Sequence, residues 1–263
     1  MERAAIQAGD LTAADTAMRQ LLAADSPLAA SSMLLLGQSL NDARDPARAR
    51  RLYADFAKRF PTSALLPTVQ FELARTHVDS GDWPAAIGEY ERWLERFAED
   101  DLRPKVEFNL AWTHSRAGAE TNAFNLFTNF LARFPTHELA RLAQFWVGDY
   151  FMRQGDFLNA QSTYQRIIES TNWPVTNITY RARFAAGRAA FKRQDWEGAG
   201  GSKGHFTLLV NDNNCLKYGD VMAEAFLALG DTKVFLSFME TNSQKTVQDR
   251  ALDRQVEARV TFE

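Results

Sequence analysis

The fold is decided by a turn signal that recurs every 37 residues: Gly81-Asp82-Trp83, Gly118-Ala119-Glu120 and Gly155-Asp156-Phe157. In each copy an alanine follows the glycine at the fifth position and an aromatic residue at the ninth, namely Ala86, Ala123 and Ala160 with Tyr90, Phe127 and Tyr164. A fixed period of this length is typical of a solenoid, in which each repeat buries its apolar face only against its neighbours. We therefore expect a protein that works by presenting a surface.

The same frame extends over the rest of the chain and predicts turns near residues 9, 44, 81, 118, 155, 194 and 230. We expect a single repeat array over residues 1–263, with about six repeats in view. Both ends read as incomplete repeats. Only eight residues precede Gly9, and residues 247–263 look like a first helix with no second helix after it.

Composition narrows the class of protein. The 263 residues are 46% hydrophobic and 24% charged, which allows a buried core and argues against wholesale disorder. A net charge of −3 gives no basic excess of the kind that nucleic-acid binding requires. The single cysteine, Cys215, forms no internal disulfide. The longest uncharged stretch, residues 26–41, is too short and too polar to span a membrane, and no apolar signal segment opens the chain.

One repeat is clearest between residues 67 and 97. Pro67 suits the first position of a helix, and Phe71, Ala74 and Val78 then share one helical face. Gly81 breaks this first helix, and a second amphipathic helix follows up to Phe97. The short connection makes the two helices antiparallel. Small residues recur seven positions before each turn, where the helices must approach closely: Gly37, Ala74, Ala111, Gly148, Gly187 and Ala223.

This pattern resembles the tetratricopeptide repeat family, which has a small residue in the first helix and an alanine and an aromatic residue in the second. The resemblance implies an all-α tetratricopeptide-type α-solenoid of antiparallel helix pairs that forms a right-handed superhelix. The repeat endings, Arg59-Phe60-Pro61-Thr62-Ser63 and Arg133-Phe134-Pro135-Thr136-His137, look like those of the bacterial outer-membrane assembly lipoprotein (BamD) and the Tol-Pal coordinator (YbgF, also CpoB).

The fifth repeat departs from the pattern. Four glycines, Gly198, Gly200, Gly201 and Gly204, lie where its second helix should run. Because each glycine costs a helix about 0.5–1 kcal/mol relative to alanine, we expect a break over residues 198–204 and a helix that starts late, near His205. The segment superficially matches a phosphate-binding loop, but its glycine and lysine spacing is wrong and no strand precedes it.

Two columns of first-helix residues are candidates for binding a partner. Arg75, Trp112, Asp149 and Arg188 share one repeat position, and Asp79, Arg116, Arg153 and Lys192 share another four residues later. In tetratricopeptide arrays these positions tend to face the concave surface, so the basic residues could accept carboxylates of a partner. The alternative is an ordinary solvated face. The family's Lys and Asn clamp for carboxyl-terminal peptides is absent, because Phe71, Phe108, Arg75 and Trp112 stand at the corresponding places.

Other constellations have plainer explanations. His77 and His114 occupy one repeat position and could approach each other, but other repeats hold apolar residues there, which indicates packing. A column of phenylalanines, Phe71, Phe108, Phe145 and Phe184, could form a partner groove but suits a core stripe better. No catalytic signature and no metal or cofactor motif is present, and Cys215 has no CxxC partner.

The sequence therefore predicts a non-enzymatic protein-interaction scaffold that holds a partner segment on its concave face. By resemblance, its place would be bacterial envelope assembly and its compartment the periplasm. Two alternatives stay open. One is a cytoplasmic adaptor or regulatory scaffold of the same architecture, and the other is a substrate-recruiting repeat region of a larger enzyme. The partner is a protein, and its identity is not encoded in any motif.

Overall fold

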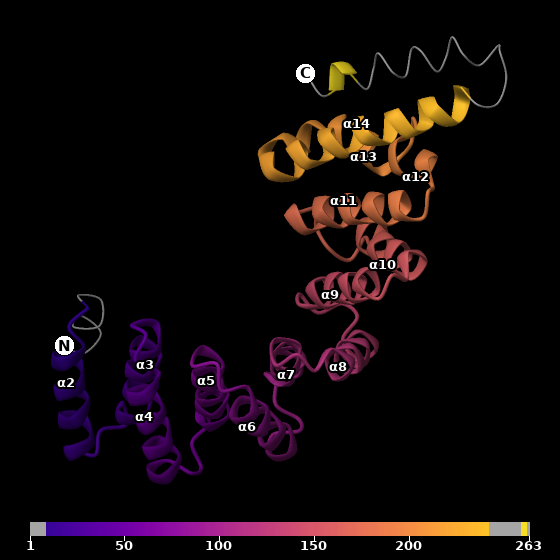
Figure 1. The fold of residues 1–263 in the computed structure, drawn as a ribbon. Coiled ribbons are helices and arrows are strands. Elements are labelled where there is room, and N and C mark those ends of the chain that lie inside the picture. The colour runs from indigo at the N-terminus through magenta and orange to yellow at the C-terminus, as the bar shows by residue number, and fades with distance from the viewer. Residues whose placement is uncertain (1–8, 242–258, 262–263) are drawn as a thin grey trace. The chain divides into compact units, whose positions relative to one another are not determined.

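The computed structural model describes residues 9–241 and 259–261, with side-chain environments up to Ser237 in the last long helix. Regular structure in these residues is helical throughout, as the sequence predicted. The chain divides into two compact units, unit 1 (Met1–Leu126) and unit 2 (Phe127–Glu263). Each is described by itself, and Figure 1 traces their helices in chain order.

Unit 1 is built from antiparallel helix pairs in which each helix packs against the next one along the chain. Its helices are α2 (Leu11–Ala23), α3 (Ala29–Asp42), α4 (Pro46–Arg59), α5 (Leu66–Asp79), α6 (Trp83–Arg96) and α7 (Arg103–Arg116). The odd-numbered helices are the first helices of the repeats, and the even-numbered ones are the second helices. The boundary between the units falls inside α8 (Glu120–Arg133).

Unit 2 continues with α9 (Ala140–Arg153), α10 (Phe157–Glu169) and α11 (Asn177–Lys192). The second helix of the fifth repeat is split into α12 (Trp196–Gly200) and α13 (His205–Val210). The predicted helix start at His205 is confirmed, but the predicted break over residues 198–204 is too long, because Gly198 and Gly200 lie in α12 and only residues 201–204 interrupt the helix. A 3-10 turn, η1 (Asn213–Lys217), then leads into the long helix α14 (Gly219–Thr241). α14 packs against both α12 and α13.

The turn inside each repeat has one construction. Six of the seven predicted turn residues have a positive φ: Gly9, Arg44, Gly81, Gly118, Gly155 and Gln194. In five of the six an aspartate follows, and its carboxylate accepts a hydrogen bond from the backbone N–H three residues on, as Asp82 does from Ala85 at 3.3 Å. A left-handed residue that ends one helix and an N-cap that starts the next together fix the reversal.

The core follows the repeat pattern. The alanine five residues after each turn is fully buried in all six repeats: Ala14, Ala49, Ala86, Ala123, Ala160 and Ala199. The residue nine after the turn fills the gap beside the small residue of the first helix. A Cβ atom on Gly148 would lie 2.5 Å from Cε1 of Tyr164, and one on Gly37 would clash with Tyr53. These positions therefore require their small residues for packing.

The break in the fifth repeat preserves this contact. In regular repeats the small residue and its aromatic partner are 16 positions apart, as in Gly37 and Tyr53 or Gly148 and Tyr164. In the fifth repeat Gly187 lies against Phe206, 19 positions on, because the stretch between Gly200 and His205 adds three residues. Phe206 is 1% exposed, so the ring reaches its place in the core despite the insertion.

The predicted turn at Gly230 is wrong. Gly230 lies inside α14, and Ala223, expected at a helix crossing, is exposed. The buried residues of α14 instead include Ala225, Leu229, Thr232 and Leu236, on both sides of Gly230. Because α14 packs along α12 and α13, an uninterrupted helix buries more apolar surface than a turn at Gly230 would. The predicted incomplete repeats at residues 1–8 and 247–263 lie outside the described residues, apart from a short helical stretch at 259–261.

Candidate functional site

In unit 1, three of the candidate residues are placed on first helices. Arg75 on α5 pairs with Glu72 at 3.0 Å, and Gln38 on α3 donates to the same carboxylate at 3.4 Å. Trp112 on α7 is 44% exposed and stacks on Phe108, with ring centroids 6.4 Å apart. An indole that is supported on one face and open to solvent on the other is a typical anchor for protein contacts.

Arg116, the third candidate of unit 1, is less available than the sequence suggested. Its guanidinium lies 5.7 Å from the ring centroid of Trp83 at the start of α6. This cation–π contact ties the end of α7 to the preceding helix. Arg116 is exposed, yet part of its role is structural.

Beneath Arg75 lie two buried tyrosines, Tyr53 and Tyr90, whose hydroxyl groups have no hydrogen-bond partner among the described residues. Burial raises the pKa of both phenols, and for Tyr53 the nearby Glu72 carboxylate adds to the rise. Arg75 opposes the rise in both cases. Both phenols therefore stay neutral at physiological pH.

In unit 2, Asp149 on α9 accepts a hydrogen bond of 2.6 Å from the hydroxyl of Tyr164. Burial raises the pKa of Asp149, while this hydrogen bond and the charges of Arg153 and Arg188 act in the opposite direction. Arg153 also lies over Trp146, 5.4 Å from the ring centroid. The structure thus brings Asp149 within the electrostatic influence of two of the predicted basic residues, one on α9 and one on α11.

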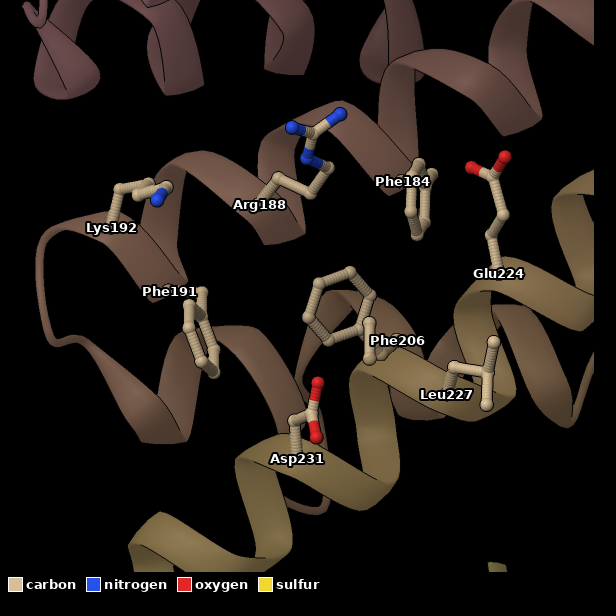
Figure 2. Close-up of a pocket in the computed structure, with 9 residues that line it drawn as sticks. Phe184, Arg188, Phe191, Lys192, Phe206, Glu224, Leu227 and Asp231 are labelled. Carbon is tan, nitrogen blue, oxygen red and sulfur yellow. The ribbon is translucent and has the colours of Figure 1, made fainter. Parts of the chain in front are cut away.

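The remaining two candidates, Arg188 and Lys192, line a cleft of about 360 Å³ between α11, α13 and α14. Phe184 and Phe191 of α11 and Phe206 of α13 supply its aromatic surface. Figure 2 shows Glu224, Leu227 and Asp231 of α14 on the opposite wall. An apolar cleft with a few charged groups at its edges is the usual form of a binding site.

Sequence reasoning missed the α14 wall. Glu224, Leu227, Ala228 and Asp231 follow the i, i+3, i+4, i+7 spacing of one helical face, and this signal was available in the sequence. The 37-residue frame instead predicts a turn at Gly230, next to Asp231, and a turn there would remove Asp231 from this helical face.

The phenylalanine column belongs mainly to the core. Phe71 is 2% exposed and lies 6.0 Å from the ring of Tyr90. Phe145 packs similarly on Tyr164, and Phe184 packs on Phe206 at 5.6 Å. Phe184 also lines the cleft, and Phe108 stacks on the exposed Trp112.

The two histidines and Cys215 are partly or fully buried. Nδ1 of His77 lies 3.5 Å from Asp82, the cap of the following helix, and burial lowers the pKa of His114. Cys215 is fully buried, and burial raises the pKa of its thiol. Within the described ranges no group of three or more His, Cys, Asp or Glu side chains has the arrangement of a metal site. None of the helices described is both long and apolar enough to cross a membrane.

Comparison with known proteins supports the tetratricopeptide repeat family. The family's sequence model matches residues 3–64 and 147–202. A search of curated proteins gave no significant match.

Solved structures share the fold. The C-terminal part of a tetratricopeptide repeat-containing protein from Cytophaga hutchinsonii aligns with 11% identity and a TM-score of 0.66, covering 100% of this chain and 98% of that one. BtubC from P. vanneervenii aligns with 17% identity and a TM-score of 0.60, covering 74% and 87%. A tetratricopeptide repeat protein from Parabacteroides merdae aligns with 14% identity and a TM-score of 0.55, covering 89% and 99%.

Proposed function

We propose that this protein is a non-enzymatic interaction scaffold that holds a segment of a partner protein on the face lined by the first helices of its repeats. One observation supports this most. The alanines and aromatic residues of the repeat pattern are buried, whereas Trp112, Arg153, Arg188 and Lys192, at first-helix positions whose identity varies from repeat to repeat, are exposed. The invariant positions build the solenoid, and the variable positions are free to specify a ligand.

The direct test compares capture of the natural partner by the wild-type chain and by two variants. Arg188→Glu with Lys192→Glu reverses the charge of the α11 wall, and Trp112→Ala removes the exposed indole of unit 1. We expect each variant to retain less partner, because hot-spot residues of this kind commonly carry much of the binding energy. Arg166→Glu, an exposed change on the second helix α10, serves as the control.

Capture is made from bacterial envelope and cytosolic extracts in parallel and quantified by mass spectrometry. Partners that bind the wild-type chain and the Arg166→Glu variant but not the first-helix variants would support the scaffold. Capture that is equal for all variants would contradict it.

We further propose an envelope role, which rests on the two repeat endings that resemble BamD and YbgF. In the structure both endings lie where a second helix of a repeat ends. Phe60 and Phe134 cap their helices by packing on Phe56 and Phe130, at 5.2 and 5.4 Å. Because helix termination alone can account for such endings, the compartment of the captured partner decides between the envelope and a cytoplasmic adaptor. A captured enzyme that acts on the partner would instead favour substrate recruitment.

A further inference from the structure

The cleft of unit 2 has walls of opposite charge. Arg188 and Lys192 lie one helical turn apart on α11, and Glu224 and Asp231 lie two turns apart on α14. Figure 2 shows Glu224 near the Phe184 end of the cleft and Asp231 below Phe206, with the rings of Phe184 and Phe206 between the two walls.

These charges are available to a ligand. In the part of the chain that the structure describes, no hydrogen bond or ion pair engages Lys192, Glu224 or Asp231, and Arg188 has only longer-range electrostatic interactions with Asp149 and Tyr164. All four side chains belong to exposed residues. The basic side chains of α11 therefore form no ion pairs with the acidic side chains of α14, although both line the same cleft.

Apolar side chains in the cleft are also exposed to solvent. Leu227 is 57% exposed between the two acidic residues of α14, and Phe184 and Phe191 on the α11 side of the cleft are only half-buried. Exposed apolar surface rimmed by charged groups is characteristic of interaction sites. A ligand must therefore bring both an apolar group and charges that match each wall.

We propose that the partner segment bound here is amphipathic with two differently charged edges. A large apolar side chain enters between Leu227 and Phe184, an acidic side chain faces Arg188 and Lys192, and a basic side chain faces Glu224 and Asp231. This inference rests on the scaffold function proposed above and specifies its ligand. A uniformly acidic or uniformly basic segment is disfavoured, because it would meet like charge on one wall, and like-charge contacts across an interface reduce affinity and exclude wrong partners.

The test uses a library of random 12-residue peptides displayed on phage and selected on the immobilised full chain. Selected sequences are made as fluorescein-labelled peptides, and their Kd values are measured by fluorescence anisotropy. We expect each selected peptide to carry an apolar residue, an acid and a base. Arg188→Glu with Lys192→Glu should weaken binding about tenfold or more, as should Glu224→Lys with Asp231→Lys.

The quadruple variant, with both walls exchanged, provides the decisive comparison. It should prefer peptides in which the acidic and basic residues have been interchanged, whereas Arg166→Glu should bind as the wild-type chain does. Because the changed residues are exposed, helical circular dichroism should stay the same in every variant. Leu227→Asp should abolish binding of the selected peptides.

Selected peptides with one sign of charge, or a quadruple variant that keeps the wild-type preference, would overturn this inference and leave the scaffold proposal intact. Failure of Leu227→Asp to affect the selected peptides would also overturn it, because the peptides would then bind elsewhere. The scaffold proposal itself is judged separately, by capture of the natural partner.

Discussion

Three glycines of first helices, Gly37, Gly148 and Gly187, lie directly against an aromatic ring of the second helix. In each case a Cβ atom would overlap the ring, so the absence of a side chain is a packing requirement. Gly88, in the middle of α6, has no atom within 4 Å of the place where a Cβ would be. Glycine is therefore required for packing at the first three positions, but packing does not require it at Gly88.

We predict that Gly148→Ala lowers the free energy of unfolding by about 1–3 kcal/mol, because the Tyr164 ring must move to admit the methyl group. Gly88→Ala should raise it by about 0.5–1 kcal/mol, because alanine is the better helix former and nothing obstructs it. Urea denaturation followed by circular dichroism measures both. Equal effects of the two substitutions would contradict the packing described here.

Asp149 gives a prediction about pH. Its pKa in the folded chain is raised above the ordinary value of 3.8, mainly by burial. The unfolded carboxyl group therefore loses its proton at a lower pH than the folded one. As pH rises from below 3.8 through the folded pKa, the free energy of unfolding falls, because the buried carboxyl group must become charged in the folded state. Above the folded pKa this loss of stability stays constant.

Asp149→Asn removes this titration while leaving an oxygen that can accept the hydrogen bond from Tyr164. We expect the variant's melting temperature to increase relative to that of the wild-type chain as pH rises through this window. The difference should be constant at higher pH. A difference that does not change with pH would show that Asp149 has no raised pKa in the folded protein.

At the scale of elements, five of the six second helices begin with an aspartate cap, which stabilises their first turn. Asp195 accepts a hydrogen bond of 2.9 Å from the N–H of Gly198 at the start of α12, a helix of only five residues. Asp195→Ala should reduce the free energy of unfolding by about 1 kcal/mol, and Asp195→Asn should lose much less because asparagine caps helices as well as aspartate does. Thermal melting of the two variants checks this, and equal losses would mean that the cap contributes little.

At the scale of the whole molecule, the period predicted most of the architecture. Turn residues such as Gly81, and the alanine that follows at Ala86, repeat because each repeat meets the same neighbours. The period failed where the neighbours differ. After the split helix of the fifth repeat, α14 packs on two short helices, so Gly230 is absorbed into a helix.

The candidate site was predicted in part for the same reason. Arg188 and Lys192 repeat the positions of earlier basic or exposed residues, and the structure places both in one cleft. In the 37-residue frame Glu224 holds the repeat position of Arg188, six residues before the predicted turn, and Asp231 holds that of the capping aspartates. The uninterrupted course of α14 brings Asp231 onto the same wall as Glu224, opposite α11.

The split second helix of the fifth repeat shows that a repeat can keep its core contact without a continuous second helix. The fifth repeat keeps its glycine-to-ring contact, although Gly200 and His205 are separated by additional residues. The exposed residues Ser202 and Lys203 in this connection are therefore a natural point for lengthening the chain, where an epitope or a fluorescent reporter could be introduced with the neighbouring repeats still stacked.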